Sequence, residues 1–267
     1  DRVSRGLGDV YKRQYLKDGF RFNFSKKINE KLETNVIEKA DAIITTVGDR
    51  YHKILKDKIT NPEKIHQIYN GYDKLNYDKI DEIKPKKFNI VFTGMLTQNH
   101  NYETFYEVLK ILKSKENNLN LILTLAGRID KKIIKIFSNK IELINKGYID
   151  HNNAISTIKS SHLLINFNYK NTEETDMISG KLIEYLASGS PIINFSNSAK
   201  ESEVILKISP KSFTANNNNI NQAVTFIKNE YSKWLVGQYK KQNLTNISSL
   251  SRENLTKKLF DIITKLK

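Results

Sequence analysis

Apolar runs alternate with amphipathic stretches along most of this chain. Runs that predict buried strands lie at 88–94, 119–127, 141–144, 163–167 and 192–195, with a sixth, edge strand at 212–215. Apolar residues at helical spacing predict helices between these strands, at 102–112, 131–137, 154–158, within 176–191 and at 220–228. This alternation is typical of an α/β domain with a doubly wound parallel sheet.

A shorter pattern of the same kind precedes this sheet. It predicts a helix at 26–39, a strand at 42–46, a turn and helix at 47–57, and a strand at 65–69. Asn70–Asp73 then forms a turn, and Lys74–Lys87 is a charged linker. After the sheet, we expect a helical segment containing Trp234 and Tyr239 and a last amphipathic helix at about Arg252–Lys267.

The first fourteen residues differ from the rest of the chain. Asp1–Gln14 has no apolar period and lacks the Lys, Asn and Ile-rich style of the remainder. The string resembles a translated sequencing-adaptor artefact, so we leave it out of the fold argument. The alternative is a genuine disordered tail. Because no initiating Met is present, we expect the natural protein to begin further upstream.

The segment Asp176–Pro191 carries the most chemical information. Ser179 is a good helix N-cap, and Gly180 lets a ligand approach the first free backbone N–H groups of the helix. Those N–H groups and the positive end of the helix dipole form an anion site. Lys181 occupies the first turn, where a cation does not stabilise a helix, and a nearby phosphate would explain it. Glu184 lies eight positions after Asp176.

This segment resembles the signature of glycosyltransferase family 4, the retaining group 1 enzymes of the GT-B fold. Their pattern places two Glu residues eight positions apart around a glycine-containing turn that opens a helix, and SGKLIEYLASGSPII is close to it. The first Glu position is Asp176 here and the second is Glu184. The alternative interpretation is an ordinary α/β turn and helix with solvated carboxylates.

The resemblance covers about Lys26–Lys267 and implies an α/β fold of GT-B type. It implies a complete doubly wound parallel-sheet C-terminal domain, preceded by a truncated remnant of a second Rossmann-like domain. The expected divisions are a non-native tail at 1–14, the remnant of the acceptor domain and linker at 15–87, the nucleotide-sugar-binding domain at 88–230, and C-terminal helices packing back on the N-terminal domain at 231–267.

The resemblance also implies roles for single residues. Lys181 would supply positive charge to the phosphates, Glu184 would accept hydrogen bonds from the ribose hydroxyls, and Asp176, although shorter than Glu, would contact the sugar. Family members often carry an Arg directly after the first strand-end glycine and a Lys a few residues on, whereas this chain has Met95 after Gly94. The expected donor-binding residues are Gly94, Met95, Arg128, Gly147, Tyr148, Ile149, Ser179, Gly180 and Leu182.

Composition narrows the chemistry. Cysteine is absent, the five histidines are scattered, and no acidic cluster has convincing metal spacing, so we expect no metal and no cofactor beyond the NDP-sugar donor. No run of about 18 apolar residues or secretory signal appears, so the cytoplasm is the expected location. The net charge is +15, and residues 228–267 carry nine basic and three acidic side chains, which could touch an acidic membrane surface.

The expected activity is therefore transfer of a sugar from an NDP-sugar to a glycan or lipid-linked acceptor, as in polysaccharide assembly. A sugar-nucleotide epimerase of the same fold and a degenerate, non-catalytic GT-B module remain alternatives. A nucleic-acid binder driven by the basic charge is a third, although no recognised motif or basic-aromatic platform supports it. The chain has no dinucleotide fingerprint, phosphate-binding P-loop or hydrolase nucleophile elbow.

Overall fold

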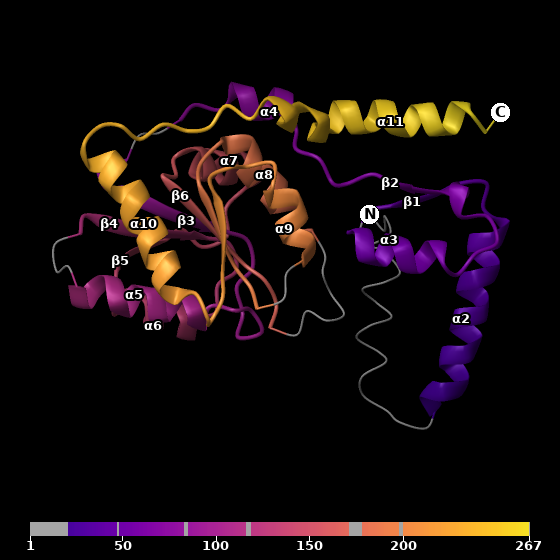
Figure 1. Ribbon diagram of the computed structural model, residues 1–267, viewed down its shortest axis with the longest axis horizontal. Helices are drawn as coiled ribbons and strands as arrows, with labels where there is room; N and C mark the ends of the chain where they lie inside the picture. The colour runs from indigo at the N-terminus through magenta and orange to yellow at the C-terminus, as the bar shows by residue number, and fades with distance from the viewer. Residues whose placement is uncertain are drawn as a thin grey trace.

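A computed structural model describes residues 21–46, 48–82, 85–115, 119–170, 178–197 and 200–266. Figure 1 shows two units, a large one built on a central sheet and a small one beside it that holds the beginning of the described chain. The predicted tail 1–14 and Asp176 lie outside the described residues. No helix among the described residues is long and apolar enough to cross a membrane.

The large unit contains a six-stranded parallel sheet in the order β5-β4-β3-β6-β7-β8. The chain builds from β3 outward to β5, returns to place β6 beside β3, and then continues outward on the other side. The β3–β6 junction is therefore the topological switch point. The strands are β3 (Phe88–Thr93), β4 (Leu121–Ala126), β5 (Glu142–Asn145), β6 (Leu163–Phe167), β7 (Ile192–Phe195) and β8 (Ser212–Ala215).

Helices cover both faces of this sheet, which confirms the predicted doubly wound architecture (Figure 1). One apolar core lies between the sheet and α5 (Glu103–Lys115), α6 (Lys131–Ser138) and α10 (Ile220–Leu235). The other lies under α7 (His151–Lys159), α8 (Gly180–Ser188) and α9 (Lys200–Leu206). The four central strands are apolar without interruption by charge because both of their faces are buried.

The small unit pairs two short parallel strands, β1 (Ile43–Thr45) and β2 (Ile65–Gln67). It also contains α2 (Arg21–Lys39), α3 (Asp49–Lys56) and a 3-10 turn at Pro62–Lys64. Its core is small and consists of Ile37, Leu55 and Ile65 with two partly buried isoleucines. The predicted apolar face of α2 is covered only at Ile37, since the side chains of its other three members remain 43%, 56% and 66% exposed.

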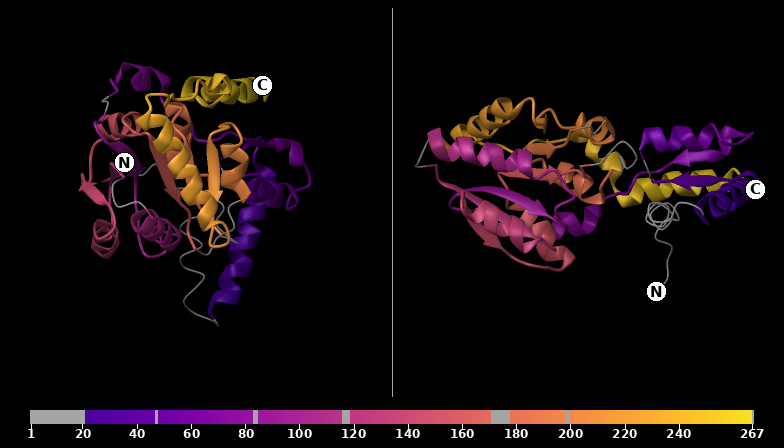
Figure 2. Two further views of the ribbon diagram at one scale, coloured as in Figure 1. Left: turned by 60° about the vertical axis from the view of Figure 1, so that its left-hand side comes forward. Right: turned by 90° about the horizontal axis from the view of Figure 1, so that it is seen from below.

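The predicted linker is not wholly irregular, because it contains the short helix α4 (Lys74–Lys79). Asp73 caps this helix by accepting a hydrogen bond from the Asn76 N–H at 2.9 Å. The last helix, α11 (Arg252–Thr264), extends from the large unit alongside the small one, as both figures show (Figures 1 and 2). The Arg252 N–H donates to the Tyr72 carbonyl at 2.9 Å, and Lys258 Nζ donates to the Gln67 carbonyl at 2.9 Å.

A carboxylate from the large unit also contacts the small one. The Asp49 N–H, in the first turn of α3, donates to Glu201 Oε2 at 2.7 Å. Gly48 at the N-cap supplies no side chain, and Glu201, which is buried, provides the acceptor instead. A Cβ on Gly48 would lie 2.0 Å from this oxygen, so any larger residue would require the Glu201 side chain to move.

The predicted helical segment containing Trp234 and Tyr239 was wrong at its end. Trp234 belongs to α10, but that helix ends at Leu235, and Tyr239 lies in an irregular segment that crosses the sheet at the amino ends of its strands. Gly237, with φ of +71°, follows directly after the helix. A helix was not predicted at α9, which lies after β7.

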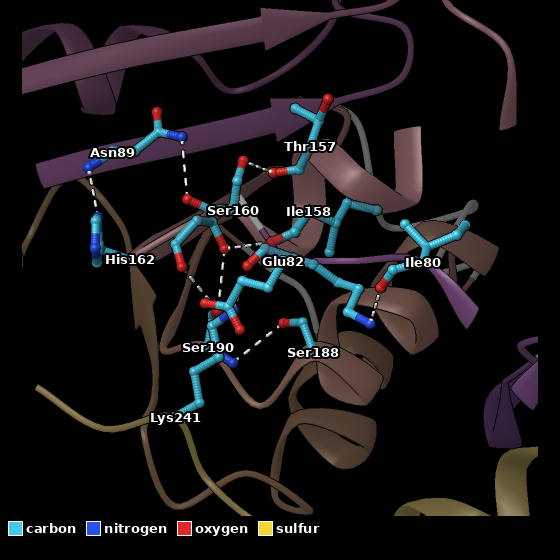
Figure 3. A network of polar contacts seen from close by, with 12 residues as sticks. Ile80, Glu82, Asn89, Thr157, Ile158, Ser160, His162, Ser188, Ser190 and Lys241 are labelled. Carbon is cyan, nitrogen blue, oxygen red and sulfur yellow. Dashed lines mark hydrogen bonds and ion pairs between the residues drawn. The ribbon is translucent and has the colours of Figure 1, made fainter. Parts of the chain in front are cut away.

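Polar contacts fasten this crossing segment to the amino ends of the strands (Figure 3). Lys241 Nζ pairs with Glu82 at 2.9 Å and also donates to the Lys159 carbonyl. The Asn89 N–H donates to His162 Nδ1 at 2.9 Å, and the two hydroxyls of Ser161 and Ser190 lie 3.0 Å apart. The linker, α7, β6 and the C-terminal segment are thus held together at this edge.

Gly189 ends α8 in the left-handed conformation, with φ of +69°, beneath the same crossing segment. The Gln242 N–H donates to the Gly189 carbonyl at 2.8 Å. A Cβ on Gly189 would lie 2.2 Å from the Gln242 carbonyl oxygen, which is backbone and cannot simply rotate away. Two independent constraints therefore require glycine at this position.

Alanine substitutions at Gly189 and Gly237 separate the cost of the left-handed backbone from the cost of the collision with Gln242. Gly237→Ala should cost about 1–2 kcal/mol of unfolding free energy, because its Cβ would meet no atom within 4 Å and only the backbone conformation is unfavourable. Gly189→Ala should cost about 1–3 kcal/mol more, because the collision with Gln242 is added. Urea denaturation of both variants measures the difference, and equal losses would contradict the packing described.

Candidate functional site

The sheet opens at its carboxyl edge between β3 and β6. These strands pair only through Ile90–Leu163 and Val91–Leu164, whereas β3 stays paired with β4 as far as Thr93. The Thr93 N–H, on the side facing β6, has no strand partner and donates to the Tyr185 hydroxyl at 2.8 Å. The tyrosine side chain from α8 therefore takes the place that a β6 carbonyl would occupy.

Tyr185 fixes the position of α8 against the end of β3. Its side chain is fully buried, and burial raises the pKa of its hydroxyl to about 12, which keeps it neutral. Its hydroxyl also lies 3.2 Å from the Thr93 Oγ1. Since residues four apart lie on the same face of a helix, Lys181 is directed to the same strand end one turn earlier.

Lys181 lies over the open edge of the sheet. Its Nζ is 4.2 Å from the centroid of the Phe92 ring, and a Cβ on Gly94 would lie 3.5 Å from it. Burial lowers the pKa of this ammonium to about 7. No carboxylate among the described residues pairs with it. A cation without a partner at the amino end of a helix is suited to an anion.

Three glycines form the lip beside Lys181, at the ends of β3, β4 and β5. Gly94, Gly127 and Gly147 have φ of +117°, +124° and +62°. A Cβ on Gly127 would lie 2.0 Å from the Gly94 carbonyl oxygen, and the Gly127 N–H donates to the Gly147 carbonyl at 2.6 Å. The backbones pack directly on one another, so a ligand could approach main-chain atoms along this lip.

His100 also lies at this edge, and the sequence did not single it out. It follows β3 in the loop before α5, is only 4% exposed, and stacks on Tyr169 with ring centroids 4.2 Å apart. Burial and the nearby Lys181 charge lower the pKa of its imidazole to about 4. The ring is therefore neutral near pH 7.

Glu184 lies one turn beyond Lys181 on α8. Its side chain is 17% exposed, and its Oε1 is 3.6 Å from His151 Nε2 at the start of α7. Burial raises the pKa of the Glu184 carboxyl, and the charges of His151 and Arg252 oppose that shift. Only part of this carboxylate is open to solvent. His151 is a second residue that the sequence did not indicate.

The remaining predicted residues of the α8 segment are Ser179, Gly180 and Leu182, and they differ in burial. Ser179 is the N-cap residue but its side chain makes no capping hydrogen bond, and Gly180 is the first helical residue. A Cβ on Gly180 would lie 4.0 Å from Asn70 Cβ, so the linker turn lies next to this helix end. Leu182 is fully buried in the core under α8, so its side chain packs within the protein, and its expected contact with the donor stays a prediction.

The predicted residues after β3, β4 and β5 lie along the rim. The Arg128 guanidinium is 5.8 Å from the Tyr148 ring centroid, and Tyr148 is 79% exposed. Met95 is half-exposed and Ile149 is partly buried. The structure thus brings Gly94 together with Lys181, Arg128 with Tyr148, and Glu184 with His151. Among the described residues, no group of three or more His, Cys, Asp or Glu could hold a metal ion.

Comparison with solved structures identifies the architecture as that of GT-B glycosyltransferases. S. aureus TarM, in a complex with UDP, alpha-GlcNAc-glycerol and fondaparinux, superposes with a TM-score of 0.59 at 15% identity, covering 88% of this chain and 46% of TarM. Anabaena HepE with UDP and glucose gives 0.59 at 11% identity, covering 89% and 67%. A glycosyltransferase from Rickettsia africae gives 0.64 at 15% identity, covering 89% and 66%.

At these identities the likeness establishes the fold. This chain spans about half the length of TarM. No protein-family model matches the sequence. No curated protein matches it either. The likeness confirms the predicted GT-B architecture, while the roles of the individual site residues stay predictions.

The contact between Tyr185 and Thr93 can be tested by removing one hydroxyl. Tyr185→Phe leaves the buried Thr93 N–H without an acceptor and should lower the unfolding free energy by about 1–3 kcal/mol. Tyr77→Phe is the control, because the Tyr77 hydroxyl contacts the Glu184 carbonyl at 3.5 Å and the Ser188 side chain. Its loss leaves no buried backbone N–H without an acceptor, and it should cost less than about 1 kcal/mol. Denaturant titration compares them, and equal losses would argue against the role of Tyr185.

Proposed function

We propose that this chain holds the donor-binding part of a metal-independent, retaining glycosyltransferase. It would move a sugar from a nucleoside diphosphate sugar to a glycan or lipid-linked acceptor. The observation that carries the proposal is the Lys181 ammonium, which is held beside Gly94 at the amino end of α8 and pairs with no carboxylate in the described part of the chain. The GT-B architecture supports it, because TarM and HepE of the same fold are described in complexes with UDP.

The chemistry requires stabilisation of a leaving diphosphate. Breaking the anomeric C–O bond transfers negative charge to the β-phosphate, which a positioned cation and backbone N–H groups can stabilise. Lys181 and the first N–H groups of α8 would serve this purpose, with the glycine lip allowing close approach. Lys181 is held by the helix anchor at Tyr185, so little reorganisation is needed when the charge develops.

The nucleoside would lie toward Glu184. Its partly exposed carboxylate would accept hydrogen bonds from the ribose hydroxyls, and the Gly147–Ile149 segment would lie near the base. His151 would hold Glu184 in place. The contact of Asp176 with the sugar, membership of family 4, retention of the anomeric configuration, and a cytoplasmic location with contact to an acidic membrane are further parts of the proposal, resting on the sequence resemblance and charge.

Calorimetric titration tests the donor site. UDP, GDP and ADP should be compared with their nucleosides on the unmodified chain, and the best ligand then used on Lys181→Gln. Loss of the ammonium should weaken the nucleoside diphosphate about tenfold or more, equivalent to about 1.4 kcal/mol, and leave the nucleoside unchanged.

Lys257→Gln is the matched control, because it removes the same charge from an exposed position on α11 where the side chain is 67% exposed. It should bind like the unmodified chain. Equal weakening by both substitutions would indicate general attraction to the basic protein. The absence of any nucleotide binding by a folded sample would overturn the proposed function.

The affinity should also depend on pH through Lys181. Burial sets the pKa of its ammonium at about 7, and a bound diphosphate stabilises the protonated form. Above pH 7 the free site must take up a proton to bind, so UDP affinity should fall between pH 7 and 9. The same titration with uridine, or with Lys181→Gln, should be flat. A pH-independent UDP affinity would exclude this role.

A further inference from the structure

The imidazole of His100 has one nitrogen engaged and one free. The Thr97 N–H donates to His100 Nδ1 at 3.1 Å, so Nδ1 is the acceptor and the ring proton resides on Nε2. The Thr97 hydroxyl lies at the same distance from Nδ1. Among the residues that the structure describes, no group accepts a hydrogen bond from Nε2. A buried ring thus presents a donor without a partner.

The loop that carries His100 is tied to the end of β6. The Asn101 N–H donates to the Asn168 carbonyl at 2.8 Å, and the Lys170 N–H donates to the Asn99 carbonyl at 2.8 Å. His100 and Tyr169 form an isolated antiparallel bridge between these hydrogen bonds. This loop therefore reconnects the two strands beyond their opening, and it places the imidazole where the Lys181 charge acts on it.

We propose that His100 donates its Nε2–H to the diphosphate that Lys181 binds. This inference rests on the proposed function and adds a second ligand contact to it. A second lysine beside Lys181 would add repulsion between like charges in a partly buried site. A neutral imidazole supplies a directed donor without that repulsion, and the Thr97 N–H fixes which nitrogen carries the proton.

Replacing His100 by Gln or by Asn distinguishes a role of the Nε2–H donor from a role of the imidazole ring in packing. Gln places an amide nitrogen near the position of His Nε2, whereas Asn reaches only as far as Nδ1. His100→Asn should weaken UDP binding about tenfold, as expected for loss of a hydrogen bond to a charged group, and leave uridine binding unchanged. His100→Gln should stay within about threefold of the unmodified chain for both ligands.

The outcomes are distinct. If the unmodified chain binds no nucleoside diphosphate, the proposed function and this inference both fail. If it binds UDP and Lys181→Gln weakens that binding, but His100→Asn does not, only the role of His100 is overturned. Equal losses for UDP and uridine in His100→Asn, or equal losses for Asn and Gln, would also overturn it, because they indicate a structural role.

A measurement on the unmodified chain covers the case in which His100→Asn does not fold. In a sample with 15N-labelled histidine, the His100 ring should show a proton on Nε2, and that proton resonance should move downfield on addition of UDP. Uridine should leave it in place. A proton on Nδ1, or a resonance that responds to both ligands alike, would contradict the proposal.

Discussion

The hydrogen bond from the Thr93 N–H to the Tyr185 hydroxyl is the constraint on which the site depends. The strand order reverses at the β3–β6 junction, and these two strands separate before their carboxyl ends. A backbone N–H in the resulting gap needs an acceptor. Tyr185 supplies it without closing the gap. The same contact fixes the rotation of α8 and so places Lys181 beside Gly94.

The amino and carboxyl edges of the sheet differ in their polar contacts. At the amino edge, Lys241 joins the C-terminal segment to Glu82 of the linker and to the Lys159 carbonyl, while the Asn89–His162 bond and the serine pair join the strand ends to one another. At the carboxyl edge, three partly exposed glycines follow the strands, and the Lys181 ammonium pairs with no carboxylate among the described residues. The carboxyl edge is therefore the edge suited to an anionic ligand.

Much of the fold could be predicted from the sequence because its causes are local. Apolar runs interrupted only by Asn and Thr marked β3, β4, β6 and β7, because strands buried on both faces rarely carry charged residues. The Gly189 stop of α8 was equally visible. The end of α10 was not, because Tyr239 is a partly buried aromatic residue in the irregular crossing segment and not on a helical face.

Only the part of the site that lies on one local segment could be predicted from the sequence. Lys181 and Glu184 were found because they share one helix with the anion-binding turn. His100 and His151 come from other loops, and only the strand order brings them to α8. Leu182 directly follows Lys181 in the sequence, but its side chain is buried in the core under α8. Proximity across a sheet edge cannot be obtained from spacing along the chain.

A crystal structure of the chain with bound UDP tests the account most directly. We predict that the β-phosphate lies at the amino end of α8, within hydrogen-bond distance of Lys181 Nζ. Tyr185 should still bind Thr93, and the ribose should lie toward Glu184. A nucleotide bound elsewhere, or a diphosphate held at this edge without contact to Lys181, would contradict it.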